Sequence, residues 1–213
     1  MDWATTRPQG GLTLRAFLGS IVLAALQPEE GLALRVRNLE FDEDGSDVLL
    51  IHSQVRQRRV EEANSVGSAR RVPSGPDLVA LLKAEVARRD LRPDGLVFVL
   101  DDGRPLTTPV YQEVWRQARS AVLDSHENAP SLGRSVTALR DACIAAWLRN
   151  GDQTAAHIFA VAECVGMSAP RLAERFACCL RKPTPGEIPW RRLEGVTDLP
   201  GLPSKPTNAA LHP

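Results

Sequence analysis

Two glycine-containing breaks divide the stretch from Ser135 to Leu180 into three segments, each with the apolar spacing of an amphipathic helix. The breaks fall at Asn150-Gly151 and at Gly166, where glycine suits the conformation in which many helices end. We therefore predict helices over 135–149, 154–165 and 171–180. Apolar residues recur at helical spacing along the first two, at Leu139, Cys143, Ala146, Trp147, Ile158, Val161, Ala162 and Val165.

The chain before residue 135 mixes helical and strand patterns. Helices are predicted over 14–26, 28–34, 78–89 and 110–122, and strands over 36–41, 48–52 and 69–73. The predicted N-caps are Thr13, then Ser74 or Asp77, then Thr107 or Thr108. The polar segment 54–68 is either a long loop or an extended hairpin. These patterns predict an α+β fold, mainly α-helical, with a small three-stranded antiparallel sheet.

Length and composition indicate one soluble domain. The 213 residues are 43% hydrophobic and 24% charged, which is typical of globular proteins with a substantial core. We predict a flexible lead over 1–11, a folded domain over 12–180 and a Pro-rich tail over 181–213. No segment is long and apolar enough to span a membrane, and the first eleven residues lack the apolar centre of a signal peptide, so we expect a cytoplasmic protein.

The charged and metal-binding residue types narrow the possible functions. Lys and Arg together equal Asp and Glu in number, so net charge gives no support for nucleic-acid binding. The four cysteines and four histidines lack the spacing of metal ligands, and we predict no metal and no cofactor.

The residues that punctuate the C-terminal helices follow a specific order. Leu139-Arg140 lies in the first helix, Gly166-x-Ser168 follows the second, and Phe176 comes ten residues after that glycine. This order resembles the C-terminal half of the tyrosine recombinase (phage integrase) catalytic domain, where H-x-L-R, G-H-S and a nucleophilic tyrosine follow one another.

The N-terminal half resembles the same family in order and spacing. Residues 24–34, AALQPEEGLAL, are similar to the family segment T-G-L-R-P-G-E-A-L-A-L. Residues 70–73 resemble R-x-V-P, residues 95–98 resemble G-x-L-F, and 103–106 and 111–115 continue the order. The resemblance covers about 12–180 and implies a stand-alone relative of the catalytic domain, without the N-terminal core-binding domain.

The resemblance also implies a chemistry. In this family a tyrosine hydroxyl attacks a DNA phosphate, arginine and His/Trp side chains hold the phosphate oxygens, and a hairpin lysine protonates the leaving oxygen. No lysine precedes Lys83 in this chain. The other family positions hold the retained Arg140 and four substitutions: Gln27 for the first arginine, Thr137 for the first histidine, Met167 for the G-H-S histidine, and Phe176 for the nucleophile. We therefore expect a degenerate pseudo-recombinase that does not cleave DNA.

Three functions remain open from these residues. The first is a DNA-binding accessory or regulator of recombination and integration, with double-stranded DNA as partner. Its predicted DNA contacts are Arg56, Arg58, Arg59, Arg70, Arg71 and Arg140. The second is a protein-interaction domain that has lost DNA binding, and the third is an active recombinase with another nucleophile.

Each candidate contact also has a structural alternative. Arg140 is alternatively a buried arginine paired with an acid such as Glu30, and the hairpin arginines form a solvated loop offset by Glu61 and Glu62. The tail, through Ile188 and Trp190, either joins another copy or a second protein, or stays disordered.

Overall fold

The computed structural model describes residues 10–42, 46–56, 59–62, 69–123 and 133–181; over 53–56 and 59–62 it describes the backbone alone. The chain divides between Leu180 and Arg181 into two compact units, and every element below belongs to the first. Residues 1–9 of the predicted lead, most of the predicted tail, Arg58, Ile188 and Trp190 lie outside the described residues. Gly11, which also belongs to the predicted lead, begins the first helix. The predicted oligomer contact through the tail therefore stays a prediction.

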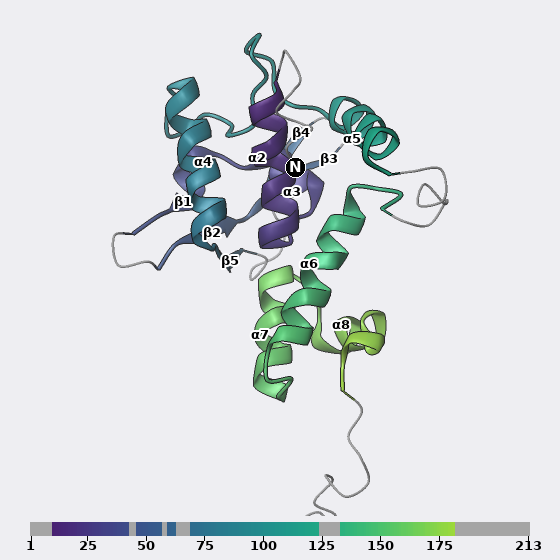
Figure 1. Ribbon diagram of the computed structural model, residues 1–213. Coiled ribbons are helices and arrows are strands. Elements are labelled where there is room, and N and C mark those ends of the chain that lie inside the picture. The colour runs from purple at the N-terminus through teal and green to yellow at the C-terminus, as the bar shows by residue number, and fades with distance from the viewer. Residues whose placement is uncertain (1–9, 43–45, 57–58, 63–68, 124–132, 182–213) are drawn as a thin grey trace, which may run out of the picture. The chain divides into compact units, whose positions relative to one another are not determined.

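Helices make up most of the described chain (Figure 1). They are α2 (Gly11–Ala24), α3 (Pro28–Ala33), α4 (Pro76–Arg89), α5 (Thr108–Val122), α6 (Thr137–Asn150), α7 (Ala155–Val165) and α8 (Ala169–Arg175), with short 3-10 turns η1 (Val36–Asn38) and η2 (Ala177–Cys179). The last predicted helix, 171–180, is thus two elements, because the helix ends at Phe176 and continues as η2. None of the described helices is long and apolar enough to cross a membrane.

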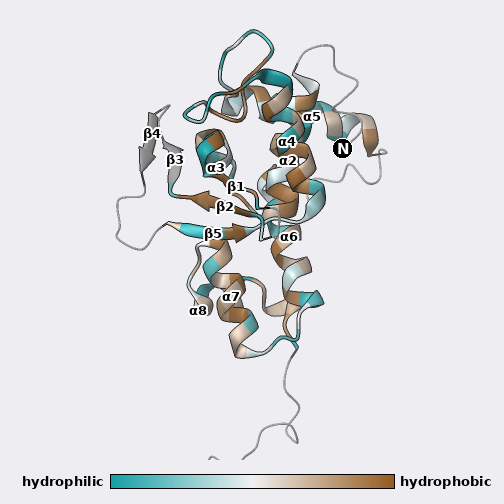
Figure 2. Ribbon diagram, turned by 90° about the vertical axis from the view of Figure 1, so that its left-hand side faces the viewer, coloured by the Kyte–Doolittle hydropathy of each residue, from teal (hydrophilic) through white to brown (hydrophobic). Residues whose placement is uncertain are grey.

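A small antiparallel sheet confirms the predicted fold class. Its three strands are β1 (Leu39–Glu40), β2 (Val48–Ile51) and β5 (Arg70–Pro73), in the order β1-β2-β5. The polar segment between β2 and β5 contains a separate hairpin of β3 (Ser53–Arg56) and β4 (Arg59–Glu62). In Figure 2, β2 has hydrophobic colouring along its length, whereas β5 begins with hydrophilic residues.

Several element starts differ from prediction. Helix α2 begins at Gly11 after Gly10, so Thr13 is not its N-cap. Residues 36–38 form a 3-10 turn in place of the predicted strand, because the Asn38 side chain accepts a hydrogen bond from the backbone N of Arg35 at 3.1 Å. Helix α4 begins after Gly75, so neither Ser74 nor Asp77 is its N-cap. The N-cap of α5 is Thr107, one of the two predicted residues.

The hydrophobic core consists of two clusters that meet at the end of α2. In the first, Phe17 of α2 is fully buried, with its ring centroid 5.3 Å from that of Phe98 and 5.0 Å from that of Tyr111. The second joins Ala25 to α6, α7, α8 and η2 through buried residues that include Ile144, Leu148, Val165, Leu172 and Phe176. Trp147 of α6 packs against both clusters. The predicted helical layer of the C-terminal part is therefore present and shares its core with the turn after α2.

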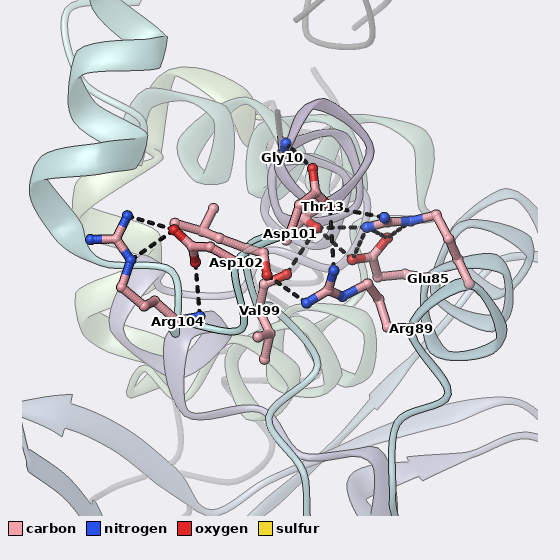
Figure 3. A network of polar contacts seen from close by, with 10 residues as sticks. Gly10, Thr13, Glu85, Arg89, Val99, Asp101, Asp102 and Arg104 are labelled. Atoms are coloured by element: carbon pink, nitrogen blue, oxygen red, sulfur yellow. Dashed lines mark hydrogen bonds and ion pairs between the residues drawn. The ribbon is translucent and has the colours of Figure 1, made fainter. Parts of the chain in front are cut away.

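A polar network ties the beginning of α2 to the end of α4 (Figure 3). Glu85 is only 2% exposed, and its carboxylate accepts hydrogen bonds from the Thr13 hydroxyl at 2.5 Å and from Arg88 at 2.8 Å. Arg88 and Arg89 also bind Asp101, which accepts a 2.6 Å hydrogen bond from the backbone N of Gly10. The apolar pattern of α4 did not predict a buried acid, because the Thr13 hydroxyl that binds Glu85 comes from a distant segment.

Candidate functional site

Arg140, near the beginning of α6, binds the turns that follow α2 and α7. Its side chain is buried, with Nε donating to the Ala25 carbonyl at 2.8 Å and Nη2 donating to the Val165 carbonyl at 2.6 Å. Ala25 has a φ of 51°, so the chain reverses there in the left-handed region as α2 ends. Burial lowers the pKa of the Arg140 guanidinium, and the negative charge of Glu30 opposes that shift. The guanidinium is therefore directed into the protein, where it satisfies backbone carbonyls.

Glu30 and Arg70 form a buried ion pair near Arg140. Their side chains are each 8% exposed, and the guanidinium donates Nη1 to Oε1 and Nη2 to Oε2, both at 2.6 Å. The Arg70 Nε donates to the Cys164 carbonyl at 2.8 Å. Glu30 also accepts the backbone N–H of Gln27 at 2.8 Å. The expected pairing of Glu30 with Arg140 is therefore wrong: Arg70 takes the carboxylate, and Arg140 takes two carbonyls.

The turn after α7 closes over these two arginines. Gly166 ends α7 with a φ of 64°, and a Cβ at this position would lie 3.3 Å from the Arg70 Nη1. Glycine therefore suits this position twice, because it adopts the left-handed conformation without strain and leaves room for Arg70. Met167 follows, half-buried against the second core cluster, and Ser168 is exposed before α8. The Met167 thioether packs against the core and has no hydrogen-bond donor for a phosphate.

The aromatic residues at the end of this arrangement carry no accessible hydroxyl. Phe176 is buried where α8 ends, and the guanidinium carbon of Arg175 lies 5.8 Å from its ring centroid. Tyr111 is the single tyrosine of the chain, and it is 3% exposed in the first core cluster against Phe17. Burial raises the pKa of its phenol. Neither ring places a reactive oxygen beside Arg140.

Solved structures of DNA recombinases and integrases have a fold similar to that of this chain. The Tn1549 transposon integrase in complex with transposon right end DNA has a TM-score of 0.67 and 14% identity, covering 92% of this chain and 62% of that one. XerH site-specific recombinase bound to difH substrate has a TM-score of 0.55 and 19% identity, covering 87% of this chain and 46% of that one. XerA recombinase has a TM-score of 0.56 and 12% identity, covering 86% of this chain and 56% of that one. The fold is that of a tyrosine recombinase catalytic domain. The chain thus spans about half to three fifths of the length of these relatives, and no family model or curated protein matches it.

The recombinase fold brings most of the predicted site positions into one region. Gln27 begins α3 beside Glu30, Arg140 lies between Ala25 and Val165, and Met167 follows Gly166 in the turn that covers Arg70. Phe176 belongs to the same core cluster as Ala25 and Cys143. Thr137 is exposed as the first residue of α6, one turn before Arg140. The catalytic roles of these positions are inferred from the family pattern and stay predictions.

Of the predicted DNA-contacting arginines, the structure describes the side chains of Arg70, Arg71 and Arg140. Arg70 is not an exposed cation, because Glu30 and the Cys164 carbonyl hold it in the interior. Arg71 is 63% exposed and its Nη2 lies 2.8 Å from the Glu40 Oε2. Arg56 and Arg59 pair across the end of the β3–β4 hairpin, and their side chains lie outside the described part, as does all of Arg58.

A signal for the inward position of Arg70 was present in the sequence. Side chains alternate between the two faces of a strand, so Arg70 shares a face with Val72, whereas Arg71 points the other way. Val72 is fully buried, which places Arg70 toward the interior as well. Among the described residues, no group of three or more His, Cys, Asp or Glu side chains is arranged to hold a metal ion.

Proposed function

We propose that this recombinase-like domain binds duplex DNA without cleaving it. The observation that carries the proposal is the buried phenyl ring of Phe176 within an otherwise retained recombinase frame around Arg140. The Tn1549 integrase and XerH were both solved with DNA, and the same fold supports DNA as the partner here.

The proposed lack of cleavage follows from the groups that face the site. Covalent recombination needs a hydroxyl that attacks phosphorus, and Phe176 has none. The two buried arginines, Arg140 and Arg70, donate to backbone carbonyls and to Glu30, so these donors are directed to protein acceptors. Loss of a single oxyanion donor typically costs about 3–4 kcal/mol of transition-state stabilisation. Gln27 and Met167 each stand at a position where the family has a phosphate-binding side chain.

A covalent trapping experiment tests this half of the proposal. A suicide DNA substrate, which captures any enzyme–DNA linkage, should give no covalent adduct with the full chain. The Phe176→Tyr variant should also give none, because Gln27 and Met167 leave the phosphate without its donors. An adduct formed by the unmodified chain would overturn the proposal and support an active recombinase with another nucleophile.

Salt-dependent binding tests the DNA half. Fluorescence anisotropy with a labelled duplex of about 30 base pairs should show binding that weakens between about 50 and 200 mM salt, since phosphate contacts release counterions. Replacing Arg56, Arg58 and Arg59 with Ser should reduce the slope of log K against log salt by up to about 3, at roughly 0.9 per lost contact.

A matched variant separates a local contact from a change in net charge. Arg92, Arg104 and Arg116 are exposed on other segments, and replacing them with Ser removes the same number of charges. This control should retain DNA affinity within about twofold at equal salt. Absence of binding at low salt by the full chain would contradict the proposal and favour the protein-interaction function.

A further inference from the structure

Two hollows adjoin each other where the end of β5 meets α6 and α7. The first has a volume of about 580 Å³ and is lined by residues that include Leu23, Asp47 and Ser74. The second has a volume of about 390 Å³ and is lined by residues that include His157, Ala160 and Val161. Pro73 and Trp147 line both, so the hollows form one continuous surface, which we name the Trp147 groove.

The first hollow contains two polar atoms with no partner in the described chain. Asp47 Oδ1 and Ser74 Oγ are both buried without a hydrogen bond. The backbone N of Ser74 donates to the Asp47 carbonyl at 2.9 Å, which fixes the two residues side by side. An unsatisfied buried acceptor costs about 1–3 kcal/mol, so a donor placed beside the Asp47 carboxylate would be favourable.

The second hollow and its surroundings are apolar. Ala160 and Val161 of α7 line it beside Trp147, and α7 carries one acidic residue, Glu163, and no Lys or Arg. Phe159 of the same helix is 64% exposed, and Leu23, at the far end of the groove, is 37% exposed. An apolar side chain entering here would remove surface from water on both sides.

We infer that the Trp147 groove binds an extended segment of a partner protein that presents an arginine or lysine a few residues away from an apolar residue. The cationic head pairs with the carboxylate of Asp47, which lines the first hollow, and its methylene stem lies along Trp147. The apolar neighbour fills the second hollow next to Ala160. Along the groove, Asp47 comes first, then the Trp147 indole, then Ala160. The basic head, its methylene stem and the apolar residue of the bound segment would meet them in the same order.

Charge selects a basic peptide over nucleic acid for this groove. A phosphate in the first hollow would meet the Asp47 carboxylate, and like charges repel. The cation at its edge, Arg71, is bound to Glu40 at 2.8 Å. The inference is independent of the proposed DNA binding, since none of its residues was predicted to contact DNA except Arg71, which it does not use.

A peptide series provides the test. The probes are fluorescein-labelled Gly-Ser peptides with one Arg and one Leu separated by about two to five residues, which spans about 7–17 Å of extended chain. At least one spacing should give saturable anisotropy with the full chain. The same peptide with Glu for Arg, or Ser for Leu, should bind at least about tenfold more weakly.

Two variants locate the site, and a third controls for charge. Asp47→Asn and Ala160→Asp should each weaken the best peptide at least about tenfold, one at each end of the groove. Asp42→Asn removes an exposed charge on a nearby segment and should change affinity less than about twofold. Unfolding temperatures of all three should remain near that of the original chain, so that loss of binding is not loss of folding.

Opposite results would overturn the inference. These are no saturable binding at any spacing, or equal affinity for the original chain and Asp47→Asn. Competition with duplex DNA distinguishes this inference from the proposed function, because peptide and DNA should bind at the same time. Displacement of the peptide by DNA would show that the Trp147 groove is not a separate site and would also overturn it.

Discussion

Glu30 and Arg70 hold each other through two parallel hydrogen bonds of 2.6 Å, although they lie forty positions apart in the chain. This pair connects the first residues of α3 to β5, and the Arg70 Nε extends the link to the Cys164 carbonyl at the end of α7. One carboxylate thus organises three segments of the recombinase-like site.

Removing that carboxylate should destabilise the fold strongly. In Glu30→Gln, the Arg70 guanidinium stays buried without its counter-charge, and we expect the free energy of unfolding to fall by about 3–5 kcal/mol in urea denaturation. Glu40→Gln is the matched control, because Glu40 pairs with the 63% exposed Arg71 and should cost less than about 1 kcal/mol. Equal losses in the two variants would contradict the structural role of the buried pair.

Gly151 is predicted to tolerate no side chain while His157 keeps its position. A Cβ on Gly151 would overlap the His157 ring, whose Nε2 lies 3.1 Å from the Trp147 carbonyl. We expect Gly151→Ala to lower the free energy of unfolding by about 1–3 kcal/mol through this overlap. In a His157→Ala background the same substitution should cost little, because the overlapping ring is gone. A cost that persists in that background would point to the backbone instead.

Asp101 should make stability fall in acid. The backbone N–H of Gly10, followed by the Arg88 guanidinium, holds the pKa of the Asp101 carboxyl below its usual range. A depressed folded pKa contributes stability above the unfolded value of about 3.9, and that contribution disappears as pH falls below about 4. Urea midpoints measured between about pH 6 and 2.5 should therefore drop less steeply for Asp101→Asn than for the original chain. Parallel pH curves would contradict this assignment.

The Cys143 thiol should be unreactive toward alkylating reagents in the folded protein. Burial raises the pKa of its thiol to about 11, so almost no thiolate exists near neutral pH. Cys178, by contrast, is exposed. Iodoacetamide labelling followed by peptide mass spectrometry should modify Cys178 in the native state and Cys143 only after denaturant is added. Similar native rates at both cysteines would show that Cys143 is accessible.

Helical periodicity predicted the C-terminal half well, because its signals are local. The break at Gly151 and the end of α7 at Gly166 fall where the sequence placed them, since a residue that ends a helix acts within its own turn. The buried Glu85 was missed for the opposite reason. Its partner outside α4 is Thr13 at the beginning of α2, and its partner within α4, Arg88, also binds Asp101; no helical pattern contains these tertiary contacts.

The residue types at the candidate site were determined by the sequence alone. No folding adds a hydroxyl to Phe176 or a guanidinium to Gln27, and the order of the surrounding segments was enough to predict the fold. Only the tertiary structure decided how the charges pair. Arg140 meets the Ala25 carbonyl across 115 positions, Glu30 meets Arg70, and Asp47 keeps an unpartnered oxygen. Such pairings depend on which segments the core brings together. The separation of two residues in the sequence does not indicate whether packing will bring them into contact.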